Sequence, residues 1–141
     1  MMIESDKDEV LNMMRVFYAS EAVATNGSDE IFLNDIENCV GDDPFSEGYV
    51  FLDKDTITGY AMLAKSFSTE FGKHCIWIED LYLKPEYRNR GTATKFFAFL
   101  EMKYAGCVLR LEAEKENESA LRTYFKNGFE EMPYTELIKS V

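Results

Sequence analysis

Long apolar runs, paired cysteines and basic charge are all scarce in this chain, and each scarcity excludes a class of protein. No stretch of the 141 residues is long and apolar enough to cross a bilayer. The cysteines Cys39, Cys75 and Cys107 are odd in number and far apart, which favours reduced cytoplasmic thiols over a disulfide framework or a metal site. The first ten residues lack the apolar core of a secretory signal. The net charge of −11 argues against a nucleic-acid or anionic membrane partner.

Charge is unevenly distributed along a chain of a length typical of one domain, predicted over residues 1–141. Between Arg15 and Lys54 there is no basic residue, but nine acidic ones occur: Glu21, Asp29, Glu30, Asp35, Glu37, Asp42, Asp43, Glu47 and Asp53. From Lys84 to Lys95 the balance reverses, with four basic residues against one glutamate. The basic segment favours an anion, whereas the acidic segment is typical either of a solubilising surface or of a site for a cation.

The segment that follows the middle of the chain predicts a strand, a basic turn and a helix. Ile76 to Leu83 is apolar and aromatic and stops before Pro85, as a strand would. Thr92 to Tyr104 contains no proline or glycine and has apolar residues at helical spacing. The intervening turn, Arg88 to Ala93, would offer free N–H groups, a helix dipole and cationic side chains to an anion. A solvated turn that only links strand to helix is the alternative.

The motif Arg88-x-x-Gly91-x-Ala93 resembles the (Q/R)-x-x-G-x-(G/A) signature of the GCN5-related N-acetyltransferases. The resemblance implies an α/β (α+β) fold with a mixed, mostly antiparallel sheet and helices on both faces. It also implies acetyl-CoA as co-substrate, with no metal. The turn that would hold the pyrophosphate consists of Arg88, Asn89, Arg90, Gly91, Thr92 and Ala93.

The other predicted elements follow the order of this family. Helices are expected over 5–24, with Ser5 as the cap, over 28–40, with Ser28 as the cap, and over 117–126, which Gly128 would end. Strands are expected over 49–52, 56–67, 107–111 and 134–138. The family's first strand would be short or absent, because only Met1 to Ile3 precede the first helix.

Two further groups of residues take their expected roles from the resemblance. The segment Asn117-x-x-Ala120-x-x-x-Tyr124 is similar to a second signature of the family, in which Tyr124 would give a proton to the leaving thiolate. Asn117 would cap its helix and contact the cofactor. A bulge in the central strand would expose backbone groups to acetyl-CoA, and the residues concerned are Leu81, Tyr82 and Leu83. Spacing alone also fits Tyr124 as a core residue.

Glu79-Asp80, directly before those strand residues, resembles the diamine and thialysine acetyltransferase branch. The resemblance implies Glu79 as the residue that relays a proton from the amine, while a solvated strand carboxylate is the alternative. Asp80 would face the other way on a regular strand. Glu112 could help line the amine pocket. His74 has no visible catalytic partner and is expected to be structural or exposed. Cys107, in an apolar strand, is expected to be a core residue.

The sequence therefore predicts acetyl-CoA-dependent N-acetylation of a primary amine by direct transfer in a ternary complex. The expected acceptor is a small cationic amine such as a polyamine, a lysine analogue or an amino sugar. Alternatives are a peptide or protein amine, a non-catalytic acyl-CoA sensor or adaptor and, last, a nucleotide binder, for which no P-loop motif is present. By analogy, the final segment 129–141 could contribute a strand edge in a homodimer.

Overall fold

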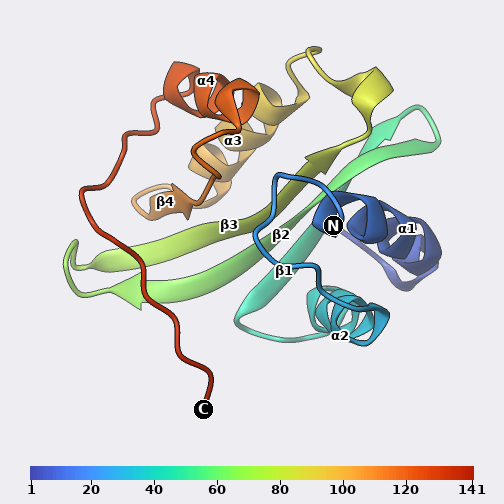
Figure 1. Ribbon diagram of the computed structural model, residues 1–141, viewed down its shortest axis with the longest axis horizontal. Helices are drawn as coiled ribbons and strands as arrows, with labels where there is room; N and C mark the ends of the chain where they lie inside the picture. Colours follow the sequence, from blue (N-terminus) through green and yellow to red (C-terminus); the bar gives the residue numbers. More distant parts are fainter.

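The computed structural model describes all 141 residues and has a single four-stranded sheet at its centre (Figure 1). The strands lie in the order β1 (Ser46–Asp53), β2 (Thr56–Ser68), β3 (Lys73–Leu83) and β4 (Val108–Leu111). The first three are antiparallel neighbours joined by short turns, whereas β4 runs parallel to β3. A mixed, mostly antiparallel sheet is what the sequence predicted.

Helices cover both faces of this sheet (Figure 1). On one face, α1 (Lys7–Tyr18) and α2 (Asp29–Val40) enclose a core of Met2, Val10, Met13, Met14, Phe32, Ile36, Cys39, Tyr60, Met62 and Tyr82. On the other face, α3 (Thr92–Lys103) and α4 (Glu118–Lys126) enclose a second core of Tyr49, Ala61, Leu63, Ile76, Ile78, Phe96, Phe97 and Leu100. No helix combines the length and the apolar character that a membrane span requires.

Helix caps lie where the polar residues of the sequence predicted them in two of the three cases. The Ser28 hydroxyl accepts a hydrogen bond from the Ile31 N–H at 3.3 Å, and Asn117 Oδ1 accepts one from the Ala120 N–H at 3.3 Å. Gly128 follows α4 with φ +85°, the left-handed conformation that stops a helix. These local signals fix the beginnings of α2 and α4 and the end of α4.

The N-terminal start differs from the prediction. Ser5 does not cap α1; a short 3₁₀ turn precedes the helix, and the Asp6 carboxylate accepts a hydrogen bond from the Ile3 N–H at 2.9 Å. The segment before it forms no strand. Met2 is nevertheless buried, and its N–H donates to the Gly48 carbonyl at 2.8 Å. This single backbone hydrogen bond takes the place of the series that a first strand would form.

Two predicted extensions are also absent. The first helix ends at Tyr18 instead of Ala24, because the chain turns there and the Ser20 hydroxyl donates to the Phe17 carbonyl at 2.6 Å. The strand predicted over 134–138 does not form, and this segment is an extended, exposed tail (Figure 1). The tail pairs with no strand of the sheet, and strand propensity alone does not hold an isolated segment.

Candidate active site

The turn between β3 and α3 leaves backbone N–H groups free. Gly91 directly precedes α3 at φ +77°, Asn89 is also left-handed at φ +60°, and no side chain caps this helix end. The first intrahelical hydrogen bond is donated by the Lys95 N–H to the Gly91 carbonyl, at 3.0 Å. The earlier N–H groups, those of Thr92 and Ala93 among them, therefore point out of the helix. A pyrophosphate fits such an end, because free amides and the positive end of the dipole coincide there.

The arginines of this turn are exposed but partly anchored. Arg88 Nε donates to the Leu83 carbonyl at 2.8 Å, and its guanidinium carbon lies 5.7 Å from the Tyr82 ring centroid. The Arg90 guanidinium lies 5.1 Å from the Tyr87 ring centroid. Both keep terminal nitrogens free for an anion, while Arg88 also ties the turn to the end of β3.

A bulge in β3 lies next to the point where the sheet opens. Asp80 pairs with Met62, and Ile78 pairs with Leu63, the next residue of β2, so that Glu79 is an extra residue in β3. The parallel pairing with β4 also stops at Ile78. Beyond the bulge, β3 continues beside β2 alone, and its backbone on the β4 side has no strand partner.

The three residues predicted to contact the cofactor through their backbone lie in this unpaired part of β3. Leu81 packs with the core under α3 and α4, whereas the Tyr82 side chain is buried on the α1 and α2 face. The Leu83 carbonyl accepts the hydrogen bond from Arg88. The gap between β3 and β4 thus presents free backbone to a ligand approaching along the sheet edge.

Tyr124 lies on α4 and packs against the same core cluster as Leu81. Its ring packs edge-on against Phe97 and Phe129, with centroids 6.1 and 6.0 Å away. Burial raises the pKa of Tyr124, so the phenol is neutral at physiological pH. Its hydroxyl forms no hydrogen bond within the chain, which leaves the proton available for donation. Asn117 uses its Oδ1 to cap α4 and keeps its amide N–H₂ free.

A pocket of about 380 Å³ lies between α2 and the strands β2 and β3. Its lining includes four carboxylates and no basic side chain: Asp35, Asp43, Glu79 and Asp80. Burial raises the pKa of Asp35. Sequence analysis did not single out Asp35 and Asp43 as site residues. The signal that could have found them is the long acidic segment without a lysine or arginine, to which both belong.

Asp80 is the most buried of these four carboxylates, with 4% of its surface exposed. It accepts hydrogen bonds from the Tyr18 hydroxyl at 2.9 Å and the Tyr60 hydroxyl at 2.8 Å. Burial raises the pKa of Asp80 to about 6; the two hydrogen bonds oppose this rise, and the charges of Asp35 and Glu79 add to it. The sequence predicted that Asp80 faces away from Glu79 on a regular strand, but the bulge breaks the alternation and both residues line one pocket.

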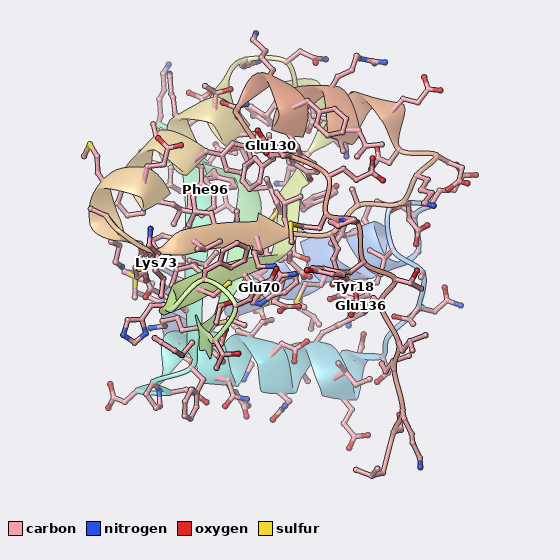
Figure 2. All side chains as sticks on the ribbon, turned by 90° about the vertical axis from the view of Figure 1, so that its left-hand side faces the viewer. Tyr18, Glu70, Lys73, Phe96, Glu130 and Glu136 are labelled. Atoms are coloured by element: carbon pink, nitrogen blue, oxygen red, sulfur yellow. The ribbon has the colours of Figure 1, made fainter.

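Glu79 lies at the edge where this pocket meets the gap in the sheet. The residue is exposed as a whole, but burial of its carboxyl raises its pKa, and the charge of Glu136 adds to the rise. A hydrogen bond to Glu136 raises the pKa of Glu112 to about 7. Figure 2 shows Glu136 on the C-terminal tail, which is tied to the β2–β3 hairpin by a 2.8 Å hydrogen bond from Tyr134 to Glu70.

His74 and Cys107 lie outside this arrangement. His74 is exposed at the start of β3, with its ring edge-on to Phe67 at 5.6 Å. Cys107 is half-buried beside the core under α3. Neither side chain lines the acidic pocket.

Comparison with known families gives the class of the protein. The model of the acetyltransferase (GNAT) family matches residues 11–129, which include the turn, the bulge and Tyr124. The chain belongs to this family. Membership in the GNAT family confirms the family resemblance, the fold class and the enzyme class that the sequence predicted.

Individual members of the GNAT family resemble the chain to different degrees. Thialysine N-epsilon-acetyltransferase of Bos taurus is 31% identical over 83 residues, which are 57% of this chain. The chain spans about half the length of that curated relative, since the match covers 48% of it.

Two solved GNAT structures show the same fold at low identity. The aminoglycoside acetyltransferase AAC(6')-Iy, in complex with the bisubstrate analogue CoA-S-monomethyl-acetylneamine, is 16% identical, with a TM-score of 0.77 over 99% of this chain and 95% of that one. A ribosomal-protein-alanine N-acetyltransferase from Brucella melitensis is 12% identical, with a TM-score of 0.70 over 99% and 96%.

Proposed function

We propose that the protein is an acetyl-CoA-dependent N-acetyltransferase that acts on a small cationic amine, by direct transfer in a ternary complex. The observation that carries this proposal is the pocket of about 380 Å³ with four carboxylates and no basic side chain. Glu79 belongs both to this pocket and to the bulge where β3 leaves β4. A cation bound in the pocket would therefore be next to the gap that fits the acetyl donor.

The donor side of the proposal assigns roles to the turn before α3 and to the unpaired part of β3. The free N–H groups of α3, with Arg88 and Arg90, bind the pyrophosphate. The unpaired backbone at Leu81 and Leu83 binds the extended arm and polarises the acetyl carbonyl. Acetyl-CoA supplies the thioester that is cleaved, and no metal is needed for this chemistry.

Two side chains act on protons and charge. Tyr124, neutral and with its hydroxyl free, donates a proton to the departing thiolate. Glu79 attracts the ammonium form of the acceptor and directs it from the pocket toward the gap. Each role uses the position of the side chain in the structure, and neither needs a covalent enzyme intermediate.

The acceptor class is supported from two directions. The relative from Bos taurus is named for thialysine, and the AAC(6')-Iy complex carries an aminoglycoside derivative, so that both names denote small amines. The Brucella structure is named for a protein alanine, and a peptide amine is therefore the second candidate. The choice of a small amine follows from the four carboxylates, which suit several ammonium groups better than a single N-terminus.

As part of this proposal we place the protein in the cytoplasm, where free thiols such as its three cysteines persist. We also keep the homodimer predicted from the sequence, because β4 has an unpaired outer edge.

Thiol release from acetyl-CoA tests the proposal directly. The assay compares spermidine, L-lysine, kanamycin and a peptide with a free N-terminal alanine, using wild type and Glu79→Gln. We expect turnover on at least one of the small cations, with a raised KM in the variant. Turnover on the peptide alone would establish the second candidate, and coenzyme A binding without turnover on any amine would establish an acyl-CoA sensor.

A further inference from the structure

Two tyrosine hydroxyls hold the carboxylate of Asp80 in one orientation. Each of its oxygens accepts one tyrosine hydrogen bond, Oδ1 from Tyr18 and Oδ2 from Tyr60. The two tyrosines differ in access: Tyr60 is fully buried, whereas Tyr18 is half-buried and lines the acidic pocket. Tyr18 therefore connects the pocket with the carboxylate behind it.

We propose that Asp80 takes the proton of the acceptor ammonium through the hydroxyl of Tyr18, while Tyr60 positions the carboxylate. This inference rests on the proposed N-acetyltransferase function. An ammonium ion has no lone pair with which to attack a thioester, so one proton must leave before transfer. The pocket attracts the charged form of the amine, which makes a nearby proton acceptor necessary.

The proton moves in two linked steps that balance. The amine N–H bond breaks as the Tyr18 oxygen gains that proton, and the original Tyr18 proton passes to Asp80 Oδ1. Tyr18 ends neutral, the amine gains a lone pair, and Asp80 becomes a carboxylic acid. Burial, together with the Asp80 charge, raises the pKa of Tyr18 far above its ordinary range, so the tyrosine transmits a proton without ionising. Asp80 later returns its proton to solvent.

The bulge is what makes Asp80 available for this role. In a regular strand, Asp80 would face α3, because Ile78 does. With Glu79 as the extra residue, Asp80 instead faces the α1 and α2 side. Glu79 makes no hydrogen bond that would orient its carboxyl, whereas Asp80 makes two. A fixed carboxylate is better suited than a loosely held one to accept a proton along a defined path.

The charges around Asp80 determine the expected pH dependence. The titratable groups that face it come from α1, α2, β2 and β3: Tyr18, Asp35, Cys39, Tyr60 and Glu79. Burial raises the pKa of Cys39 to about 12, so this thiol stays neutral. Asp80 accepts a proton only when ionised, and kcat should therefore rise with pH through a value near 6.

The test is the pH profile of kcat with the best amine of the panel, for five variants. We expect Asp80→Asn and Tyr18→Phe each to lower kcat at pH 8 by about 100-fold, the loss typical of a general base. Tyr60→Phe removes a hydrogen bond to the ionised form, so the acid limb should move to higher pH. Asp35→Asn removes a negative neighbour, so the limb should move to lower pH. Tyr104→Phe, which loses a hydroxyl bonded to Glu47 on the other face, is the matched control and should keep the wild-type profile.

Two results would overturn the proposal. One is an Asp80→Asn enzyme with wild-type kcat and acid limb, above all if Glu79→Gln loses both. The other is a carbon-13 NMR titration of the Asp80 carboxyl, which needs no turnover, in which Tyr60→Phe and Asp35→Asn fail to shift the midpoint in opposite directions. A wild-type protein that acetylates no amine would refute the proposed function, and the titration would still decide on the tyrosine-held carboxylate. Should Asp80→Asn fail to fold, Tyr18→Phe and the two opposite shifts provide the same decision.

Discussion

The Tyr104 hydroxyl lies 2.6 Å from Glu47 Oε2, beneath the C-terminal end of α3. The same buried carboxylate accepts hydrogen bonds from Lys65, at 3.1 Å, and from Lys103 and Tyr49. Burial alone would raise the pKa of Glu47, but these donors, Lys103 first, lower it to about 2. Glu47 thus joins β1, β2 and α3 on the face of the sheet opposite the acidic pocket.

Replacing Glu47 by glutamine should lower the free energy of unfolding at pH 7 by about 3 kcal/mol, because the donors lose a charged acceptor. The folded-state pKa lies below the ordinary value of 4.5, so the stabilisation is complete above that pH and disappears as the pH falls toward 2. Urea unfolding of both proteins from pH 7 to pH 2.5 measures the difference. Glu101→Gln, an exposed change on α3, should leave stability within about 0.5 kcal/mol of wild type. A difference between Glu47→Gln and wild type that does not change with pH would contradict the assignment.

Removing the Tyr124 hydroxyl should slow catalysis without weakening cofactor binding. Tyr124→Phe keeps the ring that packs on Phe97 and Phe129, and it deletes only the proton donor. We expect kcat to fall by about 100-fold, within the range of general-acid effects. Calorimetry with coenzyme A should give an unchanged Kd. Tyr134→Phe, on the exposed tail, is the control and should retain its kcat; equal rates for the two variants would exclude Tyr124 as the acid.

The left-handed turn before α3 can be tested with a pair of glycines. Gly91→Ala meets no atom within 4 Å, so its cost is the strain of φ +77°, about 1 kcal/mol. Relief of that strain would rotate the free N–H groups, and we expect the Kd for coenzyme A to rise about tenfold, which corresponds to 1.4 kcal/mol.

Gly106→Ala is a matched control for the backbone strain. Its φ is +87°, it also has open space around the added Cβ, and it lies between α3 and β4. It should lose the same stability in thermal unfolding and bind coenzyme A normally. Equal affinities for the two alanine variants would show that the turn does not bind the pyrophosphate.

The acidic pocket should recognise charge and not shape alone. Asp43→Asn removes one pocket charge but can keep the oxygen that accepts hydrogen bonds from the Phe45 and Ser46 N–H groups. We expect KM for a polycationic amine to rise about fivefold, with a smaller rise at high salt, because salt screens the lost attraction. Asp42→Asn changes the neighbouring exposed residue, which does not line the pocket, and it should leave KM unaltered. The same KM shift in both variants would point to net charge instead of the pocket.

Local signals predicted most of the elements. The caps at Ser28 and Asn117 and the stop at Gly128 were readable because each depends on neighbours within a few residues. The end of the first helix was not, because apolar residues continue to Ala24 although the chain already turns after Tyr18. The predicted final strand is a second example: its residues favour a strand, but in the structure they pair with no other strand.

The site was predictable only in part. The turn from Arg88 to Ala93 is contiguous in sequence, so its motif is visible without a structure. The bulge at Glu79 is visible only in the register of β2 against β3, and it reverses the face on which Asp80 lies. The pocket combines residues from α1, α2, β2 and β3, which no sequence spacing brings together. The acidic composition of 16–53 fitted either a cation site or a solubilising surface, and it did not identify which residues line the pocket.

The unequal pairing of the strands has a consequence for folding. Strands β1, β2 and β3 join through short turns, whereas β4 pairs over four residues and enters the sheet only after the long connection from 84 to 107. Short loops close early and at low entropic cost, so the three-stranded antiparallel unit should form first and β4 should dock last. Backbone amides of β4 would then exchange with solvent sooner than those of β2. A ligand bound across the β3–β4 gap would stabilise the part of the molecule that opens most readily.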